Sequence, residues 1–260
     1  MLKYDSNLKF KLKKLENFIK EKGKRGVVIA FSGGVDSATL AFLSKRVVSR
    51  VIAVTVKSEI VPKYELKDAE RIANEIDVEH CIINVDILSN KDFTKNSRNR
   101  CYICKKIMIK AIKSFAKSLK IDTIFDGTNL SDLKFDRPGY RAIVEEDIYC
   151  PFVYAKITKD EVRNLAKEFG LSFYCKPENS CLATRIPTGE EITVERLKRI
   201  EKAEELIRKN IGDKYVRVRD YNSIARVEVR DLFLNKSLRE KIANCLKDLG
   251  YRYVTFIKIN

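Results

Sequence analysis

The chain has 260 residues, 45% of them hydrophobic and 9% aromatic, which is enough for one large domain or for a medium and a small one. No apolar run is long enough to span a bilayer, and the first residues lack the apolar segment of a signal peptide, so we expect a soluble cytoplasmic protein. The formal net charge of +16 is compatible with RNA as a partner. Alternating lysine and glutamate residues, however, are also typical of solvated helix surfaces.

The first two thirds of the chain alternate predicted strands with predicted helices. Apolar residues at helical spacing predict a helix from Ser6 to Lys22, and Thr158 with Glu161 forms a capping box at the start of a later one. Such alternation is typical of an α/β fold, a parallel sheet with helices on both faces. The strands expected are 27–31, 51–56, 81–85 and 123–125, and the other helices are 38–45, 62–73, 101–118 and 158–169.

The pattern changes after an irregular stretch from Tyr174 to Glu191. Long irregular segments in compact domains are often functional. Beyond this stretch a small α+β domain is predicted, which divides the chain into domains 1–190 and 191–260. Its expected elements are helix 194–210, strands 215–219 and 224–229, helix 238–249 and strand 253–259.

A glycine turn follows the first predicted strand and precedes a helix, in the segment Ser32-Gly33-Gly34-Val35-Asp36-Ser37. Glycines allow close approach to an anion, and the free N–H groups of a helix start attract phosphate. The segment has neither the GxxxxGK[ST] nor the GxGxxG pattern. We expect Ser32, Gly33, Gly34 and Ser37 to bind phosphate, and Asp36 to cap the helix or to help hold Mg²⁺.

A second polar turn, Asp126-Gly127-Thr128, leaves the fourth predicted strand. Ligands of open parallel sheets bind beyond the carboxyl ends of the strands, so this turn is expected on the same rim as the glycine turn, with Asp126, Gly127 and Thr128 binding the nucleotide. Asp132 and Arg137 follow, and an arginine fork suits bidentate binding of a carboxylate or phosphate. We therefore predict that Asp132 and Arg137 contact the substrate.

The seven cysteines are improbable disulfide partners in a cytosolic protein, which favours a metal or catalytic role for some of them. Cys101 and Cys104 form a C-x-x-C pair, and Cys181 lies in the irregular stretch. These three thiols could ligate three irons of a [4Fe–4S] cluster and leave the fourth iron open. A zinc site is the alternative, but it would require a fourth protein ligand.

These motifs together resemble the LarE family, ATP-dependent sulfur transferases of the PP-loop ATP pyrophosphatase superfamily that build the nickel-pincer nucleotide cofactor. The matching segments are Ser32–Ser37, Arg100–Lys105, Asp126–Asn129 with Arg137–Gly139, and Lys176-Pro177 through Cys181–Gly189, together with Val216–Arg219 and Ala225–Val229. The resemblance implies a PP-loop (adenine nucleotide alpha-hydrolase-like) fold that binds ATP and Mg²⁺ and holds the departing pyrophosphate. Family members with all three cysteines carry a [4Fe–4S] cluster, which is therefore implied here, with Cys101, Cys104 and Cys181 as ligands.

The implied reaction adenylates the carboxylates of pyridinium-3,5-biscarboxylate mononucleotide and converts them to thiocarboxylates, releasing AMP and pyrophosphate. Asp36 and Cys181 are the implied catalytic residues, and the sulfur comes either from the cluster or from Cys181 itself. Arg185, Arg217 and Arg219 are implied substrate ligands. The family also implies a homo-oligomer and other nickel-pincer biosynthesis proteins as partners. Asp220-Tyr221 departs from the His-Gly pair expected after the two arginines.

Two other functions stay open at this point. A [4Fe–4S]-dependent tRNA thiolase shares the loop and the cysteines, and the positive charge favours it, but no RNA-binding appendage is recognisable. A nucleotide-binding module without catalysis is the third reading. Nucleic acid is therefore not expected as a partner, although the charge does not exclude it.

Overall fold

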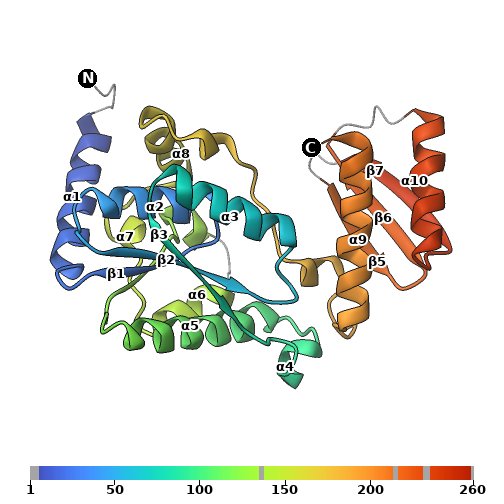
Figure 1. Cartoon of the computed structure of the whole chain (residues 1–260), viewed down its shortest axis with the longest axis horizontal. Helices are drawn as coiled ribbons and strands as arrows, with labels where there is room; N and C mark the ends of the chain where they lie inside the picture. Colours follow the sequence, from blue (N-terminus) through green and yellow to red (C-terminus); the bar gives the residue numbers. More distant parts are fainter. Residues whose placement is uncertain (1–5, 135–137, 213–215, 231–234, 259–260) are drawn as a thin grey trace. The chain divides into compact units, whose positions relative to one another are not determined.

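The computed structural model describes residues 6–134, 138–212, 216–230 and 235–258, and its internal contacts divide the chain into two compact units (Figure 1). The first unit contains the chain up to Ser58 together with two later segments, Lys63–Val85 and Cys101–Glu178. The second contains Glu59–Pro62, Asp86–Arg100 and the chain from Asn179 onward. The second unit thus takes up two short segments from the first half of the sequence, and the division at residue 190 stays a prediction.

The first unit is built on a four-stranded parallel sheet in the order β3-β2-β1-β4. Val28 of β1 lies beside Ile52 of β2 on one side and beside Ile124 of β4 on the other. Strands β2 and β3 therefore follow on one side of β1, and β4 lies on its other side. Open α/β sheets bind ligands at such a switch point, which here lies between β1 and β4. The strands are β1 (Val27–Ala30), β2 (Val51–Lys57), β3 (Glu79–Asn84) and β4 (Ile124–Asp126).

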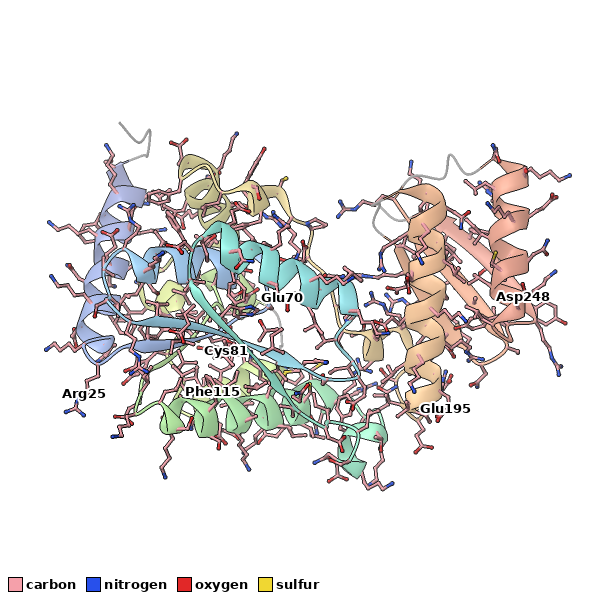
Figure 2. All side chains as sticks on the ribbon, in the orientation of Figure 1. Arg25, Glu70, Cys81, Phe115, Glu195 and Asp248 are labelled. Carbon is pink, nitrogen blue, oxygen red and sulfur yellow. The ribbon has the colours of Figure 1, made fainter. Side chains whose placement is uncertain are left out.

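Helices cover both faces of this sheet, which confirms the predicted α/β class (Figure 1). One face packs against helices near the glycine turn and the N-terminus, and the other against α5 and α6. Cys81, labelled in Figure 2, packs with the α5 face as a small hydrophobe. The helices are α1 (Ser6–Lys22), α2 (Val35–Lys45), α3 (Lys63–Glu75), α7 (Pro151–Tyr154) and α8 (Lys159–Glu168) on the first face, and α5 (Arg100–Ser118) and α6 (Pro138–Glu145) on the second.

Two predicted helix signals are confirmed. Helix α1 buries Leu8, Leu12, Leu15 and Ile19, the apolar positions that predicted it. Helix α8 begins with the full capping box, in which the Thr158 hydroxyl accepts from the N–H of Glu161 and the Glu161 carboxylate accepts from Thr158. The short helical elements were not predicted, because four or five residues show no helical periodicity. They are α4 (Lys91–Thr94), α7, and the 3-10 turns η1 (Leu130–Lys134), η2 (Ser172–Cys175) and η3 (Leu182–Arg185).

The second unit has a three-stranded mixed sheet in the order β5-β6-β7, as the predicted small α+β domain requires. Strands β5 and β6 are antiparallel, while β6 and β7 are parallel. Two helices pack with the alternate apolar residues of the strands and form a separate core. The elements are α9 (Val194–Ile211), β5 (Val216–Tyr221), β6 (Ile224–Val229), α10 (Lys236–Asp248) and β7 (Tyr253–Lys258). None of the helices within the described ranges is long and apolar enough to cross a membrane.

Candidate functional site

The glycine turn lies at the switch point and closes over the start of α2. Gly34 occupies the N-cap position with extended backbone and no side-chain cap, so Asp36, two residues further along, is not the cap. The Ser37 hydroxyl accepts from the N–H of Ser32 at 3.1 Å and lies 3.2 Å from the Ser32 hydroxyl. A helix start without a side-chain cap, rimmed by two hydroxyl groups, is an anion-binding arrangement.

Gly33 is required by the fold rather than by the ligand alone. Its φ is +65°, and a Cβ there would lie 2.7 Å from the Cα of Ala69 on α3. The turn therefore packs directly against the α3 backbone, which a side chain would prevent. The sequence suggested close approach to an anion, and the structure adds this second reason for glycine.

The turn after β4 contacts the glycine turn, so the structure brings the two predicted segments together. A Cβ on Gly127 would lie 2.9 Å from the backbone nitrogen of Ser37. Asn129 is fully buried and donates from Nδ2 to Oδ1 of Asp36 at 3.2 Å. Asp132 accepts from the N–H of Asn129 at 3.0 Å, so one of its oxygens supports this turn.

Asp36 has a second partner that the sequence did not indicate. Lys159, the first residue of α8, places Nζ 2.5 Å from Oδ2 of Asp36 and 2.9 Å from Oε1 of Glu178. Burial raises the pKa of the Asp36 carboxyl above its ordinary value, and the Lys159 ammonium acts in the opposite direction. A lysine thus lies beside the glycine turn, although the turn itself contains none.

Asp126 connects the β4 turn to the helix that carries the C-x-x-C pair. Its Oδ1 accepts from the N–H and hydroxyl of Thr128 at 2.9 and 2.6 Å, and its Oδ2 lies 2.6 Å from Nζ of Lys105 on α5. Burial acts to raise the pKa of Asp126, but Lys105 and Thr128 outweigh it and the pKa falls below its ordinary value. Asp126 is therefore a structural anion that fixes the first turns of α5 against the sheet.

The cysteines of the predicted cluster belong to different units. Cys101 and Cys104 lie one turn apart at the start of α5, exposed and half-buried respectively, while half-buried Cys181 precedes η3 in the second unit. Thiols are ligands suited to iron–sulfur clusters, and an (i, i+3) pair shares one helix face, so the C-x-x-C pair fits two of the ligands. Across the described residues no three Cys, His, Asp or Glu side chains are grouped as for a metal ion. The convergence of the three cysteines stays a prediction.

Cys150 differs from these three thiols. It is half-buried at the N-cap of α7, and burial, with Asp126 nearby, raises its pKa to about 12. A thiol held in the protonated form is a poor nucleophile and a poor ligand. None of the seven cysteines, all of which lie in the described ranges, forms a disulfide.

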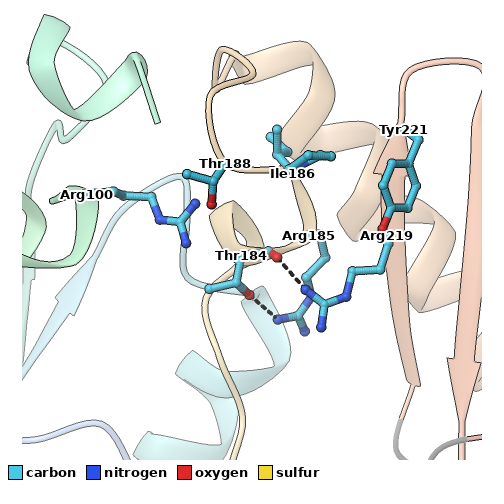
Figure 3. Close-up of a pocket in the computed structure, with 8 residues that line it drawn as sticks. Arg100, Thr184, Arg185, Ile186, Thr188, Arg219 and Tyr221 are labelled. Atoms are coloured by element: carbon cyan, nitrogen blue, oxygen red, sulfur yellow. Dashed lines mark hydrogen bonds between the residues drawn. The ribbon is translucent and has the colours of Figure 1, made fainter. Parts of the chain in front are cut away.

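The second unit contains a pocket of about 270 Å³ where its arginines meet the η3 turn (Figure 3). Arg219 donates from Nη1 to the carbonyl oxygen of Thr184 at 2.7 Å and from Nε to Glu228 at 3.1 Å. The lining therefore combines guanidinium groups, hydroxyl groups and one aromatic ring, groups that suit a phosphorylated aromatic ligand. The lining residues are Arg100, Thr184, Arg185, Ile186, Pro187, Thr188, Arg219 and Tyr221.

The other predicted arginines differ in accessibility. The Arg185 side chain is completely buried, with Nε 2.8 Å from Glu204 and Nη1 2.6 Å from the carbonyl oxygen of Ser180, so here its guanidinium holds the turn together. Arg217 is half-buried on β5, and burial, followed by the charges of Arg185 and Arg219, lowers its pKa. Such crowding of positive charge favours an anionic ligand. Arg137 lies outside the described residues.

Several residues of these sites were missed by sequence reasoning. Asn96 is fully buried, and its Nδ2 donates to the carbonyl oxygens of Pro187 and Glu190, both at 2.8 Å. Lys176 donates to the carbonyl oxygen of Gly33 at 3.0 Å. A Lys-Pro pair and a capping box were visible in the sequence at Lys176 and Lys159, but neither pattern specifies a partner more than a hundred positions away.

Comparisons with known proteins give the chain its relatives. A family model described as NAD synthase matches residues 8–190. An uncharacterised protein of Methanocaldococcus jannaschii is 36% identical over 94% of this chain and 94% of its own length, and one of Synechocystis sp. is 35% identical over 95% and 93%. The pyridinium-3,5-bisthiocarboxylic acid mononucleotide synthase of Lactiplantibacillus plantarum is 30% identical over 88% of this chain and 84% of its own.

Proposed function

Because the chain belongs to the NAD synthase family of PP-loop proteins and, within that superfamily, to the LarE family, we propose that it is an ATP-dependent sulfur transferase. Its substrate in this proposal is pyridinium-3,5-biscarboxylate mononucleotide, whose carboxylates become thiocarboxylates. Family membership supports an ATP-using enzyme, and the acceptor and the sulfur source are the proposed parts. The observation that carries the proposal is the uncapped start of α2 at the switch point, with the Asp36–Lys159 pair beside it.

The first half-reaction in this proposal is the adenylation of the substrate. A substrate carboxylate oxygen attacks the α-phosphorus of ATP, the bond to the β-phosphate oxygen breaks, and pyrophosphate leaves. The α2 start and the hydroxyls of Ser32 and Ser37 bind the pyrophosphate as its charge develops. Lys159 supplies a cation on the same rim, and Asp36 is a carboxylate ligand for Mg²⁺ that would exchange its lysine partner for the metal.

The second half-reaction needs a sulfur nucleophile at the adenylated carbonyl carbon, with AMP as the leaving group. We assign this role to Cys181, which lies in the matching segment, is half-buried and forms no disulfide. When Cys181 itself is the donor, loss of its α-proton and cleavage of its Cβ–S bond leave dehydroalanine and a thiocarboxylate. A [4Fe–4S] cluster held by Cys101, Cys104 and Cys181 would instead supply sulfide from its open iron.

The second unit supplies the proposed phosphate recognition. Arg219 and the half-buried Arg217 lie on one sheet face, and Arg219 lines the pocket beside Thr184 and Thr188. A guanidinium group that already holds a backbone carbonyl is pre-organised for bidentate phosphate binding. A cytoplasmic homo-oligomer that passes its product to other nickel-pincer biosynthesis proteins completes the proposal.

The test is a turnover assay with anaerobically purified protein, ATP, Mg²⁺ and the dicarboxylate nucleotide. We expect AMP and pyrophosphate to appear together with a product in which sulfur replaces carboxylate oxygen, identified by mass spectrometry. Cys181→Ala should still release pyrophosphate but form no thiocarboxylate. Pyrophosphate release with tRNA, or with a deamido dinucleotide and ammonia, and none with the dicarboxylate nucleotide, would overturn the assigned substrate.

A further inference from the structure

Lys176 makes an unusual set of contacts next to the glycine turn. Its Nζ donates to the carbonyl oxygen of Gly33 at 3.0 Å, and it also lies 2.7 Å from Oδ2 of Asp68 and 3.2 Å from Oε2 of Glu65. The side chain is only 14% exposed. An ammonium group has three N–H donors, so these three acceptors use its full capacity.

The two carboxylates come from α3, the same helix on which Gly33 rests. Ala69, whose Cα would clash with a Cβ on Gly33, follows Asp68 directly and lies one helical turn after Glu65. Helix α3 thus presents a small residue under the turn and two anions beside it. Lys176 joins the anions to the carbonyl group of the turn.

The charge of Lys176 is already neutralised, so it differs from a phosphate-binding lysine. One ammonium faces two carboxylates, which leaves these three side chains with a net negative charge. Burial acts to raise the pKa of Asp68, but Lys176 and Arg71 outweigh it and keep the pKa below its ordinary value. The Asp68 carboxylate therefore remains ionised at neutral pH and holds the ammonium group where it is.

The contact with Gly33 fixes the direction of one peptide group. In a trans peptide the carbonyl of Gly33 and the N–H of Gly34 point in opposite directions, so fixing one fixes the other. Lys176 holds the carbonyl on the side of α3, and the Gly34 N–H points to the other side, where the Ser32 hydroxyl accepts it at 3.3 Å. A peptide between two glycines rotates easily when nothing holds it.

We propose that Lys176 is a positioning residue for nucleotide binding: it orients the Gly33–Gly34 peptide so that the glycine turn presents an N–H, and not a carbonyl oxygen, to the pyrophosphate part of ATP. The inference rests on the proposed binding of ATP at this turn. It goes beyond that proposal because it assigns a role to a residue that does not touch the ligand. It also explains why a lysine is buried between α3 and the turn.

The experiment measures the binding of ATP with Mg²⁺, and separately of inorganic pyrophosphate, by isothermal titration calorimetry. Lys176→Met should weaken both about ten- to hundredfold, the value of a charge-assisted hydrogen bond to a carbonyl, while Lys176→Arg should retain part of the affinity. Lys67→Met is the matched control, because Lys67 is an exposed lysine of α3, and it should bind like the wild type. In turnover, Lys176→Met should raise KM for ATP while KM for the carboxylate substrate stays constant.

A double variant separates positioning from simple electrostatics. Lys176→Met with Asp68→Asn restores the net charge of the three side chains but not the hydrogen bond to Gly33. The double variant should bind ATP as weakly as Lys176→Met, and recovery to the wild-type affinity would overturn the inference. If Lys176→Met does not fold, Lys176→Gln takes its place with the same expected loss of about tenfold or more.

The outcomes also separate this inference from the proposed function. Wild-type affinity for both ligands in a folded Lys176→Met variant would refute the positioning role and leave the function intact. Absence of ATP and pyrophosphate binding in the wild-type protein would refute the function itself, together with any role that depends on it.

Discussion

Asn129 donates a hydrogen bond from its Nδ2 to Oδ1 of Asp36 across 3.2 Å, although the two residues are 93 positions apart in the chain. This bond joins the turn after β4 to the first turn of α2 across the switch point of the sheet. Lys159 binds the other carboxylate oxygen of Asp36. The orientation of the Asp36 carboxylate is therefore determined by two residues that no local pattern connects to it.

Asn129→Ala should destabilise the protein by removing the hydrogen bond between the turn after β4 and Asp36. The substitution leaves Oδ1 of Asp36 without its amide partner in a largely buried place, which costs about 1–3 kcal/mol of unfolding free energy. Urea denaturation measures this loss. Asn129→Asp, which places a second carboxylate against Asp36, should be less stable than the alanine variant, and equal stability of the two would argue against the contact.

Asp36→Asn should leave the thermal stability of the protein unchanged or higher while lowering its ATP turnover. Burial raises the pKa of Asp36, so the folded protein binds its proton more tightly than the unfolded chain does. Below the ordinary pKa of aspartate, the proton bound to Asp36 stabilises the folded protein. This stabilisation is lost as the pH rises through the raised pKa of Asp36 in the folded state. At pH 7 the neutral asparagine should therefore be no less stable than wild type, measured as Tm.

The same variant should lose ATP turnover by about a hundredfold or more, because the proposed Mg²⁺ ligand is removed. Asp160→Asn, on an acidic residue of the first turn of α8, is the control for charge alone and should retain turnover. An Asp36→Asn variant with wild-type pyrophosphate release would exclude Asp36 from metal binding.

The single histidine predicts a defined pH dependence of stability. His80 Nε2 lies 2.7 Å from the Thr55 hydroxyl, which itself donates to the carbonyl oxygen of Phe31, so His80 is the donor in this chain of hydrogen bonds. Burial lowers the pKa of His80, with Glu70 acting in the opposite direction. The unfolded chain therefore takes up the proton first as pH falls below about 6.5, and stability declines there.

Unfolding free energies between pH 5 and 7.5 measure this effect, and the chain has no second histidine to confuse the assignment. His80→Gln should flatten the profile over the upper part of that range. A profile unchanged by the substitution would show that His80 titrates as it does in the unfolded chain.

The proposed cluster ligands have a spectroscopic test. Anaerobically purified protein should be brown, and Cys101→Ala, Cys104→Ala and Cys181→Ala should each reduce the iron and sulfide content, because a three-ligand site loses affinity with each thiolate. Cys245→Ala, on α10, should keep the colour. A wild-type iron content in any of the first three variants would remove that residue from the ligand set.

The mass of Cys181 after turnover identifies the sulfur donor. Loss of the elements of H₂S from Cys181 indicates that this residue gave up its own sulfur, whereas an unchanged mass with continued turnover indicates sulfide held elsewhere. Peptide mass spectrometry of the turned-over protein distinguishes the two.

Local patterns in the sequence predicted the parts of the fold that depend on neighbouring residues. Three such patterns are the apolar stripe of α1, the capping box at Thr158 and the glycine turn at Ser32–Ser37. In each of them the residues that determine the local structure lie within a few positions of one another. The alternation of strands and helices also predicted a parallel sheet with helices on both faces, but not the order of its strands. This is why the α/β class and the two turns at the rim of the sheet were predictable from local patterns, whereas the PP-loop fold was implied by the family resemblance.

Contacts between distant segments were not predictable in the same way. The family resemblance implied Arg185 as a substrate ligand, but it did not indicate that the side chain is buried against Glu204. Lys176 reaches Gly33 across 143 positions, and no pattern near either residue signals the other. Such pairs depend on which elements pack together, and that information lies in the tertiary structure.

Asn96 shows how such a distant contact can organise a functional segment. It is fully buried with φ of +55°, and its amide donates to the carbonyl oxygens of Pro187 and Glu190, while its backbone carbonyl accepts from the N–H of Gly189 at 2.9 Å. Arg100 also donates to its side-chain oxygen. One amide group thus holds the turn that lines the pocket of the second unit.

Asn96→Ala should cost at least about 2 kcal/mol of unfolding free energy, since several buried polar groups lose their partner. Part of any loss comes from placing alanine at a positive φ, and Asn222→Ala measures that part, because Asn222 has φ of 56° but an exposed side chain. The difference between the two variants in urea denaturation is the contribution of the buried amide. Equal losses would assign the whole effect to backbone conformation and leave the 187–190 turn held by its other contacts.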